Sequence, residues 1–180
     1  VHLFQMRQIE SHSDGSGGFT FSTDGTKLFT VGLGTDKVIE YALSVAYDIN
    51  TMKYVREFSV ASQDDLPMDL KFNADGTKMF VLGSRGDDVN EYALSTGFDV
   101  STASFTDAFS VNNEDTSAKG VGFNADGTKM YITGDATETI YSYTLSTGFD
   151  VSTASVDSTS FDIRSHWPSS SSTSPGNEPG

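Results

Sequence analysis

A seven-residue phrase, Phe-x-x-Asp-Gly-Thr-Lys, occurs three times in this chain, and each copy begins 51 residues after the one before. The copies span residues 21–27, 72–78 and 123–129. A second phrase keeps the same interval, reading Tyr-Ala-Leu-Ser from Tyr41 and Tyr92 and Tyr-Thr-Leu-Ser from Tyr143. A fixed period of about this length indicates one supersecondary unit that is copied and stacked.

The second repeat contains four strand-like segments. Residues 68–73 and 89–94 alternate polar and apolar side chains, residues 78–83 are apolar enough to be buried on both faces, and residues 105–111 form the fourth segment. Between the first two, Ala-Asp-Gly-Thr is a tight turn in which Gly76 supplies a positive φ. With no helical periodicity in the chain, this unit predicts an all-β fold, a β-propeller with three four-stranded antiparallel blades.

The recurring aspartates and aromatic residues have structural explanations. Each repeated Asp is expected to accept hydrogen bonds from its own turn or loop, because a single carboxylate per turn is too isolated to bind calcium. The recurring aromatic side chains are expected to pack between blades. The aspartates are Asp24, Asp75 and Asp126 in the Asp-Gly turns, and Asp48, Asp99 and Asp150 after the third strands.

Composition narrows the possible partners. The net charge is −14, from 25 acidic and 11 basic residues, which disfavours nucleic acid and anionic membrane surfaces as partners. No apolar run approaches the roughly 20 residues of a spanning helix. The absence of cysteine excludes disulfides and thiolate metal sites. The acidity fits either solubility or the binding of a divalent cation, with calcium as the candidate cofactor.

Strand counting against the repeat divides the chain into five parts. Residues 1–10 hold an orphan outer strand at 3–9, residues 11–60, 61–111 and 112–163 are the blades, and residues 164–180 are a Ser/Pro-rich disordered tail. Propellers typically have four to eight blades, so three do not close a ring. We expect self-association into a homodimer with a six-bladed ring; the alternative is a piece of a longer propeller.

Sites are sought where the repeats differ. The connections from fourth to first strands are acidic, and we predict that they form a ligand-binding rim at one mouth of the channel, with the second-to-third strand loops at the opposite end. The predicted ligand-binding residues are Asp14, Asp64, Asp65, Glu114 and Asp115. No catalytic residue is predicted, because the only histidines, His2, His12 and His166, lie near the ends of the chain.

Residues 72–80, Phe-Asn-Ala-Asp-Gly-Thr-Lys-Met-Phe, with the segment 92–104, resemble the repeats of WD40-like and YVTN-like propellers, especially in phage and marine bacterial surface or tail-associated proteins. The resemblance covers about residues 19–163, although the Trp-Asp dipeptide of WD40 blades is absent. It implies a non-enzymatic binding or scaffolding module, extracellular or on a virion or cell surface, with a glycan or protein ligand. The alternatives are a lactonase-type propeller hydrolase with a carboxylate-held metal in its channel, and a structural array without a ligand.

Overall fold

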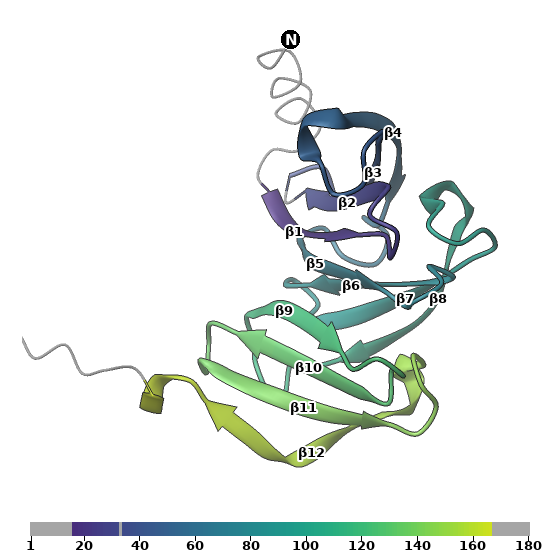
Figure 1. Cartoon of the computed structure of the whole chain (residues 1–180). Coiled ribbons are helices and arrows are strands. Elements are labelled where there is room, and N and C mark those ends of the chain that lie inside the picture. Colours follow the sequence, from purple (N-terminus) through teal and green to yellow (C-terminus); the bar gives the residue numbers. More distant parts are fainter. Residues whose placement is uncertain (1–15, 33, 167–180) are drawn as a thin grey trace, which may run out of the picture.

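The computed structural model describes residues 16–32 and 34–166, and within them three four-stranded antiparallel sheets follow one another along the chain (Figure 1). These sheets are blade 1, with β1 (Ser16–Phe21), β2 (Lys27–Gly32), β3 (Lys37–Leu43) and β4 (Met52–Ser59); blade 2, with β5 (Pro67–Phe72), β6 (Lys78–Gly83), β7 (Asp88–Leu94) and β8 (Ala103–Ser110); and blade 3, with β9 (Ala118–Phe123), β10 (Lys129–Gly134), β11 (Thr139–Leu145) and β12 (Ala154–Asp162). The predicted all-β fold of propeller blades is confirmed.

In each blade the Asp-Gly turn packs against the loop that follows the third strand. Gly76 has a φ of 72°, and a Cβ on it would lie 2.3 Å from the Phe98 ring, so only glycine fits beneath that ring. The Phe98 N–H also donates to the Gly76 carbonyl at 3.0 Å. Gly25 meets Tyr47, and Gly127 meets Phe149, in the same way. The two sequence phrases also meet directly, because the Leu94 N–H of the second phrase donates to the Thr77 carbonyl of the first at 2.8 Å.

The repeated aspartates accept hydrogen bonds locally, as predicted. Asp75 accepts from the Thr77 N–H at 3.0 Å, and Asp99 accepts from the Ser101 N–H at 3.1 Å, where it caps the 3₁₀ turn η2 (Val100–Thr102). In blade 1, hydrogen bonds from the Ser22 hydroxyl and from the Thr26 N–H and hydroxyl lower the pKa of Asp24 to about 2. These carboxylates therefore stabilise turns.

Aromatic rings fill the space between neighbouring blades. The ring centroid of Phe29 lies 4.6 Å from that of Phe72, and the centroid of Phe80 lies 4.5 Å from that of Phe123. Phe29 and Phe80 are both fully buried, as expected for inter-blade packing. At the same position in blade 3, Tyr131 is 40% exposed, because no described residue packs over that face as the next blade does in blades 1 and 2.

A Lys–Glu pair on each of the first two blades holds the next blade. In blade 2, Lys78 Nζ lies 2.7 Å from Glu91 Oε1 and donates to the Phe149 carbonyl at 2.5 Å. Glu91 Oε2 accepts the Val151 N–H at 3.0 Å. The pair therefore binds one carbonyl and one N–H of the following blade, and we call this arrangement the clamp.

The same clamp joins blades 1 and 2. Lys27 pairs with Glu40 at 2.9 Å and donates to the Phe98 carbonyl at 2.5 Å, while Glu40 Oε2 accepts the Val100 N–H at 3.2 Å. Both glutamates are almost completely buried. The clamp satisfies polar groups that would otherwise be buried without partners at the joint.

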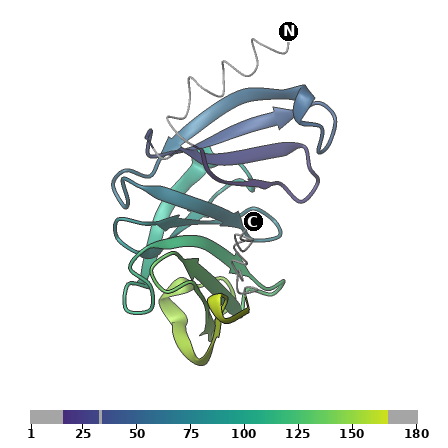
Figure 2. The same ribbon diagram turned by 90° about the vertical axis from the view of Figure 1, so that its left-hand side faces the viewer.

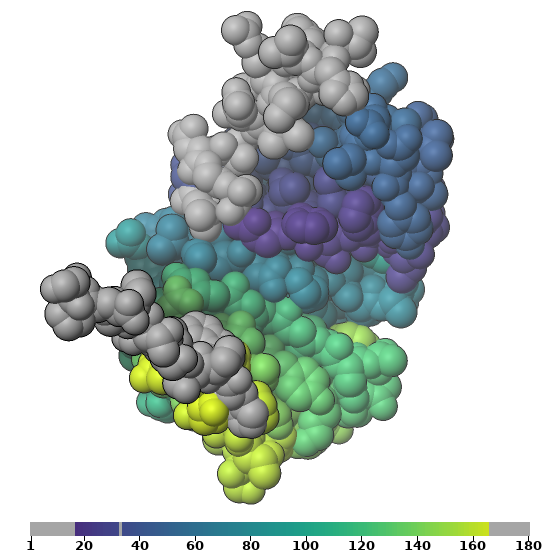
Figure 3. All heavy atoms as spheres, turned by 60° about the vertical axis from the view of Figure 1, so that its left-hand side comes forward, coloured from purple at the N-terminus to yellow at the C-terminus, as the bar shows by residue number. Residues whose placement is uncertain are grey.

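The three blades form an open stack. The first strands β1, β5 and β9 lie against one another, and Figures 2 and 3 show the blades as successive layers from the purple-blue first to the green-yellow third. One face of blade 1 and one face of blade 3 therefore have no blade of the described chain against them. Closure of a ring by a second chain stays a prediction.

Some predictions concern parts of the chain that fall outside the described residues. These are the orphan strand at residues 3–9, Asp14, His2, His12 and the tail from residue 167. The first three residues of the predicted tail form a 3₁₀ turn, η4 (Arg164–His166), instead of a disordered segment. No helix in the described ranges is long and apolar enough to cross a membrane.

Candidate functional site

The acidic loops lie at the same end of the blades as the second-to-third strand loops, so the prediction that they lie at opposite ends is wrong. Asp64 in the connection between β4 and β5 accepts the Gly86 N–H, between β6 and β7, at 2.7 Å. In a sheet of four consecutive antiparallel strands, the second and fourth strands run in the same direction. The loops that follow them therefore leave from the same end of the sheet. The two loop sets therefore form one surface.

Two of the predicted ligand-binding residues are buried inside these loops. Asp64 also accepts the Leu66 N–H at 2.6 Å, and Asp115 accepts the N–H groups of Ser117 at 2.8 Å and Thr137 at 3.0 Å. Burial opposes the charged form of Asp115, but the hydrogen bonds from Thr137 and Ser117 outweigh it and lower the pKa of the carboxyl. Each carboxylate therefore joins the loop before the first strand of its blade to the loop between the second and third strands.

The other two described candidates are nearer to solvent. Asp65 forms an exposed ion pair with Arg85 at 2.5 Å. Glu114 accepts a hydrogen bond from the Tyr143 hydroxyl at 3.3 Å, and burial of that ring raises the tyrosine pKa. The structure does not bring Asp65 and Glu114 together with Asp64 and Asp115 into a metal site: among the described residues there is no cluster of three or more His, Cys, Asp or Glu. Ligand binding by these loops stays a prediction.

The first strands carry a charged pair that we did not predict from the sequence. Asp69 on β5 holds Lys71 Nζ with both oxygens, at 2.8 and 2.9 Å. Asp69 also accepts the N–H of Leu70 at 2.8 Å and, across the blade joint, that of Val121 at 3.1 Å. On the side of blade 1, Gly18 approaches Asp69 so closely that a Cβ on Gly18 would lie 2.1 Å from Asp69 Oδ1. Asp69 therefore lies where the first strands of all three blades meet.

A departure from the repeat could have revealed this pair. Residues 69 and 71 are Asp and Lys in blade 2, whereas the corresponding residues are Gly and Thr in blade 1 and two glycines in blade 3. The difference lies inside a strand, whereas the predicted ligand-binding residues all belong to predicted loops. Glycines occupy three of the four corresponding positions, so the charged pair of Asp69 and Lys71 has no counterpart at these positions of the other first strands.

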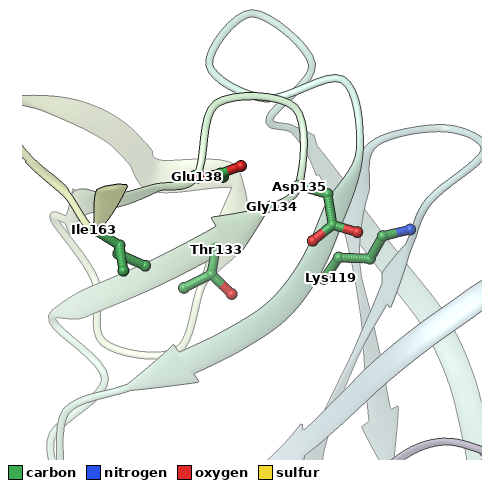
Figure 4. A pocket seen from close by; sticks show the side chains of 6 residues that line it. All are labelled: Lys119, Thr133, Gly134, Asp135, Glu138 and Ile163. Carbon is green, nitrogen blue, oxygen red and sulfur yellow. The ribbon is translucent and has the colours of Figure 1, made fainter. Parts of the chain in front are cut away.

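Hollows lie on the open face of blade 3, and one of them has Asp69 in its lining. One of about 520 Å³ is lined by Asp69, Gly120, Val121, Gly122, Tyr131, Thr133 and Ile140. Another, of about 390 Å³, lies toward the loops, where Figure 4 shows Lys119 beside Asp135 and Ile163 on the opposite side. In blade 2 the residues matching Tyr131, Thr133 and Ile140 are Phe80, Leu82 and Val89, which are all buried against blade 3. The hollows are thus the uncovered half of a blade joint.

Comparison with known proteins supports the fold. No family model matches the chain, and no curated protein is similar to it in sequence. Similar solved structures include a proposed 6-phosphogluconolactonase from Bacteroides fragilis (TM-score 0.62, 11% identity, 84% of this chain and 40% of that one) and the periplasmic gluconolactonase of Pseudomonas aeruginosa (TM-score 0.57, 17% identity, 84% and 40%). A third is the Cps50 β-propeller domain of Myceliophteria thermophila (TM-score 0.55, 10% identity, 88% and 46%).

These similarities show a propeller fold, and the chain spans less than half of the length of each of these structures. They correct the expectation of a non-enzymatic module, because lactonase propellers among the similar structures favour the enzyme alternative instead. That expectation gave too much weight to the scarcity of histidine, since water can open a lactone without a Ser–His pair. The phage and marine parts of the resemblance have no counterpart among these structures.

Proposed function

We propose that this chain supplies three blades of a propeller that hydrolyses a lactone. The observation that carries the proposal is the likeness in fold to the two bacterial lactonase structures, which extends over more than four fifths of this chain. Because the chain spans 40% of each of those proteins, the proposal concerns the complete assembly in which these blades work.

The chemistry requires water to attack the lactone carbonyl and the ring C–O bond to break. Negative charge develops on the carbonyl oxygen during the attack, and a fixed cation close to that oxygen stabilises it. Lys71 is the candidate for that cation, because its side chain is one-third exposed and the other first strands carry no charge at its position. Asp69 is a positioning residue, because its oxygens already accept N–H groups from three residues and are not available to a substrate.

A metal held by carboxylates in the channel does not fit the described residues. Asp69 is the one acidic side chain on the described first strands, and no cluster of three or more potential ligands is present in residues 16–32 and 34–166. No step of the proposed reaction therefore passes through a metal.

Lactone hydrolysis by the full chain, in its solution assembly, tests the proposal. Acid release from glucono-1,5-lactone is followed by titration at constant pH, and we expect a rate above that of buffer. Lys71→Met should lower kcat/KM by about tenfold or more, whereas Lys53→Met, which removes the same charge from the exposed outer strand β4, should leave kcat/KM unchanged. A folded wild-type protein with no rate above buffer contradicts the function, and equal rates for the two variants contradict the role of Lys71.

A further inference from the structure

The open face of blade 1 carries groups that are buried in the other two blades. Ile49, Val100 and Val151 occupy the same position in the three repeats, yet Ile49 is 61% exposed while the two valines are fully buried. Phe19 and Tyr47 are also more than half exposed, whereas Leu70 and Phe98 at the same positions of blade 2 are buried and partly buried. Large apolar side chains gathered on one face mark a surface that binds a partner.

The polar groups that a clamp would bind are present on this face. The clamp takes one carbonyl and, two residues later, one N–H: those of Phe98 and Val100 in blade 2, and of Phe149 and Val151 in blade 3. In blade 1 the corresponding groups are the Tyr47 carbonyl and the Ile49 N–H, and no residue in the described ranges is hydrogen-bonded to either. Tyr47 has the positive φ of Phe98 and Phe149, so the local backbone is already in the bound conformation.

Blade 3 does not carry a clamp that could bind these groups in a second copy of the chain. Ser142 replaces the glutamate. Lys129 Nζ bonds within its own blade, to Thr144 Oγ1 at 2.7 Å and Asp157 Oδ2 at 2.9 Å. Asp157 lies in a bulge of β12, where the pairing of Tyr141 with Ser160 shifts to that of Tyr143 with Val156. The charged groups of this face are therefore satisfied inside blade 3.

We propose that the open face of blade 1 docks a further blade of the same repeat type, one with a lysine and a glutamate at the positions of Lys27 and Glu40. The two joints inside this chain are the template for the interface, since each uses the same pair against the same backbone groups. The third blade of a second wild-type copy cannot form this clamp, because Ser142 stands in place of the glutamate. The proposal is independent of lactone hydrolysis.

Rebuilding the clamp on blade 3 of the full chain tests the proposal. Ser142→Glu with Asp157→Thr reproduces the set Lys78, Glu91 and Thr106 of blade 2. Blade 3 of a second copy of the variant then carries the lysine and glutamate that the proposal requires. These can bind the Tyr47 carbonyl and the Ile49 N–H of the first copy. Its matched control is Ser142→Gln with Asp157→Thr, which has the same size but no charge. Sedimentation equilibrium gives the dissociation constant of the species at twice 19.3 kDa.

We expect the glutamate variant to associate about tenfold or more tightly than the glutamine variant, because a hydrogen bond to a charged group is stronger than one to a neutral group. Adding Ile49→Pro should abolish the gain, since it removes the N–H at the first position of a 3₁₀ turn, where proline fits, and Asp48 before it is already extended. Adding Ile49→Val should preserve the gain. Equal dissociation constants for the glutamate and glutamine variants, or a gain that survives Ile49→Pro, overturn the proposal.

Discussion

Phe80→Ala is expected to lower the free energy of unfolding by about 4 kcal/mol. The Phe80 ring is fully buried between blades 2 and 3, with its centroid 4.5 Å from that of Phe123 and 6.0 Å from that of Phe149. The substitution leaves a cavity at the joint, where rings from both blades lose their contacts. Urea unfolding of the variant and wild type measures the loss.

Tyr131→Ala is the matched control, because Tyr131 occupies the same position in blade 3. Its side chain is 40% exposed and has no described blade against it, so the expected loss is about 1 kcal/mol or less. Similar losses for both variants would mean that in solution the open face of blade 3 is as well covered as the joint, and would contradict the open arrangement.

Glu91→Ala is expected to cost about 3 kcal/mol. Glu91 is 4% exposed, and its removal leaves the Lys78 ammonium and the buried Val151 N–H without their acceptor. The figure lies at the lower end for a broken buried pair, since the Lys78 side chain is one-third exposed and is partly hydrated after the change.

The control for this variant is Ser142→Ala, at the equivalent position of blade 3. Ser142 donates to Asp157 but contacts no other blade of the described chain, so the loss should be that of one hydrogen bond, about 1 kcal/mol. Urea midpoints that fall equally for both variants would show that the clamp adds nothing to the joint.

The repeat predicted the blades because each strand is encoded locally. Residues 78–83 were predicted as the second strand and coincide with β6, and the alternating segment 68–73 is one residue from β5. The glycine of the Asp-Gly turn was also predicted, from its need for a positive φ. Local signals of this kind depend on side-chain alternation and turn geometry, which a single sequence displays.

The joints could not be predicted in the same way. Lys27 and Glu40 are separated by 13 positions in the sequence but are paired across β2 and β3, and they bind backbone groups that lie 71 and 60 residues further on. We assigned that lysine to a turn phrase. Its second partner lies in another blade, and a partner so far along the chain leaves no local signal in the sequence. Asp69 was missed for a related reason, since its contacts are with Gly18 and Val121 in the two neighbouring first strands.

The functional prediction failed where it relied on what the sequence lacks. Because the histidines lie near the ends of the chain, we argued against a nucleophile activated by a histidine base. That argument does not apply to direct attack by water with a lysine close to the carbonyl oxygen. The acidic loops drew attention because they differ between repeats, but Asp64 and Asp115 in them are bonded to backbone N–H groups of the same blade. Variation in a loop and a role in binding are separate properties.

Hydrogen exchange at three backbone amides tests most directly whether the clamp forms the blade joints and leaves blade 1 open. The N–H groups of Val100 and Val151 are held by Glu40 and Glu91, whereas Ile49 at the same position has no such acceptor in the described chain. Protection factors from exchange measured by NMR should be about 100-fold or more higher at the two valines than at Ile49. Equal protection at all three amides would contradict the account.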